Sequence, residues 1–150
     1  MTKTRRTVRL TVTGEQTDAD GRRDSVRTDC IAEYEYRDGT HVFTYLETDP
    51  QSGAVTRSQM RLAAESCSIV RTGEINARME FVPDRERHCD YGTPFGSLSM
   101  AIVTERIAMR QIGENFHARI RYRMAFEGAD PVECAVTIKS EPVSHRKPIE

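Results

Sequence analysis

Two short stretches carry the residue types that could act on a polyanion. The segment EYEYR, residues 33–37, spaces two carboxylates and one guanidinium group two residues apart. The segment NFHARIRYRMAFEG, residues 115–128, has basic side chains at every second position: His117, Arg119, Arg121 and Arg123. If both rows faced the inside of a β-barrel, the carboxylates could hold a divalent metal and the guanidinium groups could grip phosphate. The direction of these rows therefore decides the class of function.

The apolar residues between the charges predict that direction. In residues 115–128 the alternate positions are Phe116, Ala118, Ile120, Tyr122, Met124 and Phe126. Burying this row costs little, whereas burying three guanidinium groups would need counter-charges to offset several kcal/mol of desolvation. Glu33 and Glu35 likewise alternate with Tyr34 and Tyr36. We predict that both charged rows face outward. EYEYR resembles the ExExK signature of triphosphate tunnel enzymes, so a phosphohydrolase with inward arginines stays as the third hypothesis.

Two charged residues share the parity of apolar rows and are candidates for the interior. In HVFTYLE, Glu47 follows Phe43 and Tyr45 at every second position, and in SIVRTG, Arg71 follows Ile69. If both rows face inward, the side chains of Glu47 and Arg71 both lie inside the barrel. We predict that they form a buried ion pair or lie half wet at the barrel rim. The alternative is that they line a polar pocket.

Nothing in the sequence supports catalysis or a metal site. Nucleophilic catalysis needs a Ser or Cys with a His and an orienting acid, and no GxSxG or similar elbow is present. The cysteines are widely separated and no CxxC motif occurs, which predicts reduced thiols rather than a zinc site or a disulfide framework. His88, Cys89 and Asp90 are adjacent, but three adjacent strand residues alternate between faces. We expect no cofactor and no catalytic residues.

The elements that position these residues are short strands. Nine glycines separate runs of period-two alternation, as in a meander of strands. The expected strands cover residues 8–12, 26–36, 41–47, 55–62, 67–72, 75–81, 88–91, 98–109, 116–126 and 134–138. Helices at VTRSQMRLAAES and TERIAMRQIG are rejected because neither has a clean apolar stripe. The fold class is therefore all-β, a single antiparallel up-and-down β-barrel of about eight to ten strands.

Two local features refine this expectation. The apolar parity switches within residues 98–109, from Met100 and Ile102 to Val103 and Ile107, which predicts a bulge near residues 103–105. The segment after residue 141, with two prolines and mixed charge, is expected to fray. The barrel should then occupy about residues 6–140.

Composition limits the partners. At 150 residues the chain fits one domain, and its net charge of -1 gives no global field for gathering nucleic acid. No stretch approaches the length of a membrane span and MTKTRRTVRL is no signal peptide, so we expect a cytoplasmic protein without nucleic-acid or membrane partners. The sequence leaves the oligomeric state open.

The order of motifs resembles a known family. TYLE (44–47), IVRTGE (69–74), MEF (79–81), DYGTPFGSL (90–98), Thr104 and IRYRM (120–124) resemble bacterial YwiB-like proteins, a family of unknown function. Its members are similar to calycins, the lipocalin-like β-barrels. The resemblance spans roughly residues 6–140 and implies a fold rather than a ligand, and the chain has no Trp for the lipocalin Gly-x-Trp signature. The matching residues could be structural or form a site: Tyr45, Glu47, Arg71, Gly73, Tyr91, Thr93, Pro94 and Gly96.

Three hypotheses for function follow. The first is a barrel that binds a small apolar or amphipathic ligand, with inward aromatics around a polar anchor. Its candidate ligand-binding residues are Phe43, Tyr45, Glu47, Arg71, Tyr91, Thr93 and Tyr122. The second is a protein-interaction or regulatory module with a solid core, which would use the outward row of arginines. The third is the tunnel phosphohydrolase.

Overall fold

The computed structural model describes residues 4–143, and all its regular elements are strands. The strands are β1 (Thr4–Thr17), β2 (Arg23–Arg37), β3 (Thr40–Thr48), β4 (Val55–Leu62), β5 (Cys67–Gly73), β6 (Ala77–Phe81), β7 (Glu86–Thr93), β8 (Gly96–Ile112), β9 (Asn115–Phe126) and β10 (Val132–Pro142). Each of the ten predicted strands is present, and both segments rejected as helices lie largely in strands. No helix in residues 4–143 is long and apolar enough to cross a membrane.

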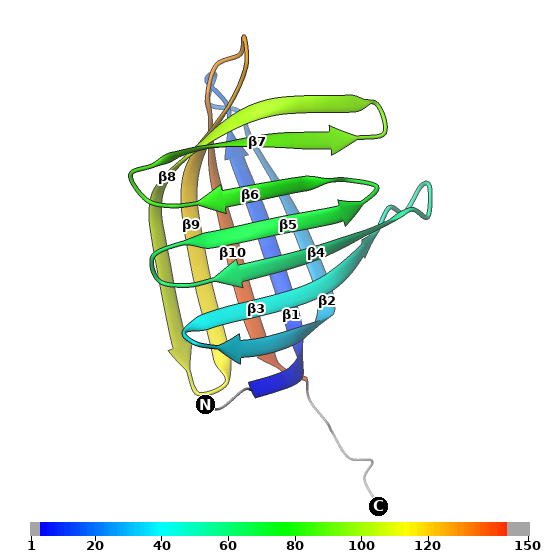
Figure 1. Cartoon of the computed structure of the whole chain (residues 1–150), viewed down its shortest axis with the longest axis vertical. Helices are drawn as coiled ribbons and strands as arrows, with labels where there is room; N and C mark the ends of the chain where they lie inside the picture. Colours follow the sequence, from blue (N-terminus) through cyan, green and yellow to red (C-terminus); the bar gives the residue numbers. More distant parts are fainter. Residues whose placement is uncertain (1–3, 144–150) are drawn as a thin grey trace, which may run out of the picture.

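The strands form one antiparallel sheet that curls into a nearly closed barrel (Figure 1). Their order is β6-β5-β4-β3-β2-β1-β10-β9-β8-β7, so every ladder except β1 with β10 joins strands that are consecutive in the chain. The two edge strands, β6 and β7, meet through an isolated bridge between Asn76 and Gly92 rather than a ladder. Figure 1 shows β3 to β7 crossing in front of the upright β1, β9 and β10. The predicted up-and-down barrel is confirmed.

The apolar rows face inward, as predicted. On β9 the side chains of Phe116, Ala118 and Ile120 are buried, whereas Arg119 and its neighbours Arg121 and Arg123 are exposed. Glu33 on β2 is also exposed, and Glu35 is half-buried in ion pairs with Arg5 and Arg37. The interior therefore contains neither the guanidinium row nor the carboxylate row that a phosphate tunnel requires. The tunnel-enzyme hypothesis is wrong.

The predicted bulge explains how β8 keeps apolar side chains on the inner face on both sides of its change of parity. The register between β8 and β9 shifts between Thr104 and Arg106, which leaves Glu105 as the extra residue. This shift returns Ile107 to the inner side after the change of parity that the sequence shows. The bulge lets the 17-residue strand bend from β7 to β9.

The first two residues of the segment expected to fray belong to β10. Glu141 and Pro142 pair with Arg9 and Val8 of β1 and extend the ladder that joins the two ends of the sheet. The backbone hydrogen bonds of this ladder hold the chain two residues further than its proline and charges suggested. The rest of the predicted tail, residues 144–150, lies outside the described residues.

Aromatic rings fill the lower half of the barrel. Phe43 is fully buried and packs against Tyr34, at a centroid distance of 4.9 Å, and against Phe116, at 5.6 Å. His41 closes this cluster, with Nδ1 only 2.8 Å from the hydroxyl of Tyr34. Burial lowers the pKa of His41, so its imidazole is a neutral member of the core.

Replacing Phe43 by Ala should lower the free energy of unfolding by about 3 to 5 kcal/mol, because the ring leaves a cavity among rigid neighbours. The matched control is Leu46→Ala on the same strand, since Leu46 is 62% exposed on the outer face and should change stability by about 0.5 kcal/mol or less. Urea denaturation measures both. Equal effects of the two variants would contradict the assigned faces of β3.

Candidate functional site

The inner side of β3 to β6 is built in rows that become more polar toward one end. Cross-strand pairing places residues of neighbouring strands in register, so each row is read directly from the ladders. From the closed end to the open end the rows are His41, Leu62, Cys67 and Phe81; Phe43, Met60, Ile69 and Met79; Tyr45, Ser58, Arg71 and Ala77; and Glu47, Thr56 and Gly73. The two apolar rows fill the barrel, and the two polar rows stand where it opens.

A cavity of about 360 Å³ occupies the polar end. From β3 to β7 it is lined by Tyr45, Glu47, Met60, Ile69, Arg71, Met79 and Tyr91, and from the opposite wall by Val12, Tyr122 and Val136. This volume lies within the range of roughly 300 to 1,000 Å³ found for small-molecule pockets. The upper part of the barrel is therefore hollow.

The mouth of the cavity opens where β2 leaves β3. Their ladder covers only residues 33–37 of β2, while the ladder with β1 continues to Arg23. Among the described residues, positions 23–32 have β1 as their only ladder partner, which leaves a gap in the barrel wall. Val26 lies at this gap and lines the cavity, although it is 68% exposed. A molecule that entered here would cover an apolar side chain that the protein leaves in water.

Arg71 is the cation of the cavity. Its Nη1 donates a hydrogen bond to the Tyr91 hydroxyl at 3.3 Å, which joins β5 to β7 across the end of β6. Its Nε is buried and has no hydrogen-bond partner among the described residues. No described carboxylate forms an ion pair with this guanidinium group, although a desolvated charge normally has one.

Glu47 is the anion of the same cavity, one row nearer the mouth. Its Oε1 accepts a hydrogen bond from the Ser58 hydroxyl at 2.9 Å. Ser58 in turn lies directly opposite Arg71 in the β4–β5 ladder. Glu47 and Arg71 thus lie inside together, as predicted, but within the described part of the chain no ion pair joins them. The predicted ion pair is wrong, because the Ser58 hydroxyl holds Glu47 and the Tyr91 hydroxyl holds Arg71 instead.

Burial holds the phenols of the cavity in their neutral form. Burial, assisted by the negative charge of Glu47, raises the pKa of Tyr45 to about 12, while the positive charge of Arg71 opposes this shift. Burial also raises the pKa of Tyr122, whose ring lies edge-on to Phe81 at 4.8 Å. Tyrosines in this state donate and accept hydrogen bonds without adding charge. The tyrosines therefore add no charge of their own to the cavity, whose inner wall carries Arg71 and Glu47 and whose mouth carries Asp24.

The structure brings together five of the seven candidate residues from the sequence: Tyr45, Glu47, Arg71, Tyr91 and Tyr122 all line the cavity. Phe43 lies one row deeper, within the aromatic cluster. Thr93 lies in the β7–β8 turn, where its hydroxyl bonds the Gly96 carbonyl and the Phe95 amide. Sequence reasoning missed Ser58, although its parity with Met60 and Leu62 on β4 placed it on an inner row.

The remaining groups with catalytic or ligand chemistry lie apart. His41 and Glu47 are six residues apart on one strand, about 20 Å at the usual rise. Cys89 is buried, whereas its neighbours His88 and Asp90 face outward and bond Glu86 and Ser99. Within residues 4–143, no group of three His, Cys, Asp or Glu side chains has the arrangement of a metal site.

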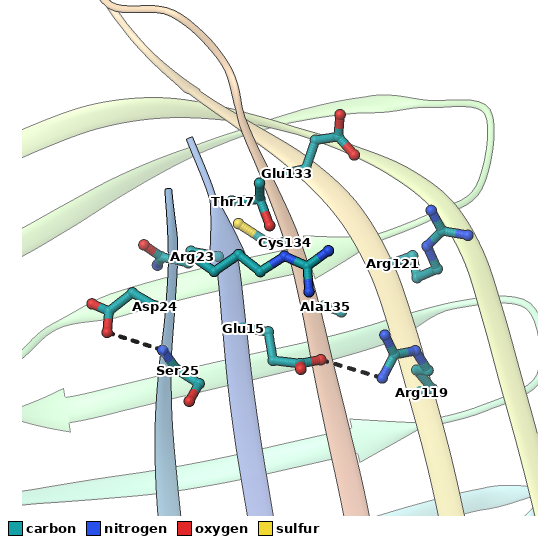
Figure 2. A pocket seen from close by; sticks show the side chains of 11 residues that line it. Glu15, Thr17, Arg23, Asp24, Ser25, Arg119, Arg121, Glu133, Cys134 and Ala135 are labelled. Atoms are coloured by element: carbon teal, nitrogen blue, oxygen red, sulfur yellow. Dashed lines mark hydrogen bonds and ion pairs between the residues drawn. The ribbon is translucent and has the colours of Figure 1, made fainter. Parts of the chain in front are cut away.

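A second, larger depression of about 700 Å³ lies beside the mouth, at the upper ends of β1, β2, β9 and β10 (Figure 2). It shares Glu15, Gln16, Asp24 and Ser25 with the inner cavity. Figure 2 shows Glu15 and Arg119 pointing toward each other across β10, at 3.4 Å. Solvated ion pairs of this kind contribute little, and the lining is mostly polar. The inner cavity is the better candidate site.

Replacing Glu47 by Gln should lower the pKa of Tyr45 from about 12, because a negative charge that opposes phenolate formation is removed. Arg71→Gln should raise it. The pKa of Tyr45 lies above its ordinary 10 in the folded protein, so the free energy of unfolding should fall as pH rises from 10 to about 12. A pH titration of tyrosine Cζ signals by NMR, assigned with Tyr45→Phe, measures the shifts. Titration of Tyr45 at its ordinary value would contradict the assigned burial.

Comparison with known proteins agrees with this architecture. The crystal structure of the ywiB protein from Bacillus subtilis matches with a TM-score of 0.81 at 18% identity, over 93% of this chain and 94% of that chain. At this identity the likeness shows a shared fold, and it confirms the resemblance inferred from the motifs; the wider relation to calycins stays a prediction. No curated protein matches the chain. A family model described as a domain of unknown function, DUF1934, matches residues 10–138. The chain therefore belongs to the DUF1934 family.

Proposed function

We propose that this barrel binds a small amphipathic molecule in its inner cavity. The observation that carries the proposal is the hollow upper half of the barrel, which opens at the β2 gap and contains two charged groups without ionic partners. An interior that served stability alone would be filled, because an unfilled apolar cavity costs stability. The apolar row of Met60, Ile69 and Met79 would receive the body of the ligand, and the row above would receive its polar head.

The second hypothesis, a solid barrel that acts through its outer face, has less support. Its premise of a solid core conflicts with the cavity. Its candidate surface is also largely self-neutralised, because Arg119 pairs with Glu15 at 3.4 Å and Arg123 pairs with Glu105 at 3.1 Å. These pairs leave little of the arginine row for an acidic partner. Binding in the cavity is therefore the function that the geometry supports best.

The proposal can be tested by filling the cavity. Val12 lines the cavity, whereas the next residue, Thr13, faces the outer surface. Val12→Phe should weaken ligand binding by about tenfold or more, because the ring takes the space of the ligand. Thr13→Phe adds the same ring outside and should leave binding unchanged.

Binding can be followed by thermal shift against a panel of amphipathic metabolites, and by native mass spectrometry of any molecule that copurifies. The proposal predicts at least one stabilising compound whose effect is lost in Val12→Phe and kept in Thr13→Phe. No stabilising compound in the panel and no copurifying molecule, or equal effects of the two variants, would refute it.

A further inference from the structure

We infer that the ligand is a small zwitterion of the amino-acid type, with a carboxylate that Arg71 binds, an ammonium group that Glu47 binds, and an apolar side chain. This inference rests on the proposed function and specifies its ligand. Its basis is that the cavity holds two opposite charges, each lacking an ionic partner among the described residues, in adjacent rows of one wall.

The two charges are placed to bind a molecule between them rather than each other. Glu47 is tied to Ser58, and Arg71 is tied to Tyr91, so hydrogen bonds direct the two side chains toward different strands. The space that separates them belongs to the cavity that both line. A zwitterion would supply the missing partner on each side at once. A ligand with a single charge would leave the other group desolvated and unpaired, which costs free energy.

The guanidinium group offers the geometry that a carboxylate requires. Nη1 of Arg71 already has a partner, but the buried Nε has none. Planar N–H donors of arginine match the two oxygens of a carboxylate in a fork. Protein atoms cover Nε, so a carboxylate in the cavity would bind the terminal nitrogens of the guanidinium group. The Tyr91 hydroxyl, whose oxygen accepts from Nη1, could donate its own proton to the same carboxylate.

The charge pattern of the mouth orients the ligand. Arg71 lies one row deeper than Glu47, and the mouth adds the carboxylate of Asp24. The field of Glu47 extends to β2, where it acts with burial to raise the pKa of Cys30. A dianion such as a phosphate monoester would meet these acids with an uncompensated negative charge. The zwitterion instead places its carboxylate inward and its ammonium group toward the acidic mouth.

The apolar part of the ligand has a defined place. Below Arg71 the cavity is lined by Met60, Ile69 and Met79, and the facing wall contributes Val136 and the ring of Tyr122. These side chains offer flexible thioethers and an aromatic face, which adapt to an apolar group of aromatic or branched shape. A hydrophobic amino acid fits this arrangement better than a polar one.

Three matched probes separate the two charged contacts. L-Phenylalanine carries both charges, 3-phenylpropanoate lacks the ammonium group, and 2-phenylethylamine lacks the carboxylate. Isothermal titration calorimetry should show phenylalanine binding about tenfold or more tightly than either analogue, because charged hydrogen bonds contribute about 1.5 to 3 kcal/mol each. Leucine, 4-methylpentanoate and 3-methylbutylamine repeat the comparison with a branched side chain.

Two variants assign each contact to its residue. Arg71→Gln should weaken phenylalanine and 3-phenylpropanoate and leave 2-phenylethylamine unchanged, whereas Glu47→Gln should weaken phenylalanine and the amine and leave the propanoate unchanged. If Arg71→Gln does not fold, Arg71→Lys replaces it, because lysine keeps the positive charge but lacks the forked donors. This variant should also weaken the binding of phenylalanine and 3-phenylpropanoate and leave that of 2-phenylethylamine unchanged. Arg57→Gln, which removes an exposed guanidinium group from the outer face of β4, should change nothing.

The outcomes distinguish this inference from the proposed function. If an analogue with one charge binds as tightly as its parent amino acid, or if Glu47→Gln affects all three probes equally, the zwitterion is excluded. The inference is equally excluded if no probe binds. In either case the proposed function would still hold if another compound bound the protein and lost its binding in Val12→Phe. If no compound behaved in this way, both the zwitterion inference and the proposed function would be excluded.

Discussion

The barrel depends on the ladder between its first and last strands. β1 and β10 pair over ten residues, from Val8 with Pro142 to Thr17 with Glu133, and thereby join segments that are more than a hundred residues apart. Every other ladder is a hairpin between consecutive strands, which can form locally. Without the β1–β10 ladder the sheet would be two separate meanders, so closing this long loop is the main entropic cost of the fold. The ladder also makes the wall that faces Arg71 across the cavity.

The sequence predicted the strands because alternation is a local property. A buried face selects an apolar row of period two, and the change of parity in β8 revealed a bulge that the register shift at Thr104 confirms. It also predicted which charged residues lie inside, because Glu47 and Arg71 continue apolar rows. The absence of an ion pair between them escaped prediction, since parity assigns a side chain to a face but not to a partner. The position of the cavity mouth was also not predicted. It depends on the point where β2 separates from β3, and the curvature of strands that are distant in the sequence sets this point.

The polar end and the apolar end of the barrel have different physical roles. The cluster around Phe43 and His41 is dense and uncharged, and supplies the burial that stabilises the fold. The rows of Arg71 and Glu47 do not add to stability in this way, because they place two charged groups in half-buried positions beside an unfilled space. Separating these roles along the barrel axis lets the closed end maintain the strand register while the open end carries groups that destabilise the empty protein.

A purely structural account of Arg71 meets a quantitative difficulty. Arg71 is half-buried, so its guanidinium group has lost part of its hydration without gaining a carboxylate partner, and a methionine of similar length would fill the same row without that cost. A single hydrogen bond to the Tyr91 hydroxyl recovers about 1.5 to 3 kcal/mol, and the buried Nε recovers nothing within the described structure. A bound ligand would reduce this imbalance, because a carboxylate against the terminal nitrogens of Arg71 would supply the missing counter-charge. The same reasoning applies to Glu47, whose hydrogen bond from Ser58 leaves its negative charge uncompensated. Two uncompensated charges of opposite sign facing one cavity therefore favour a ligand that carries both counter-charges.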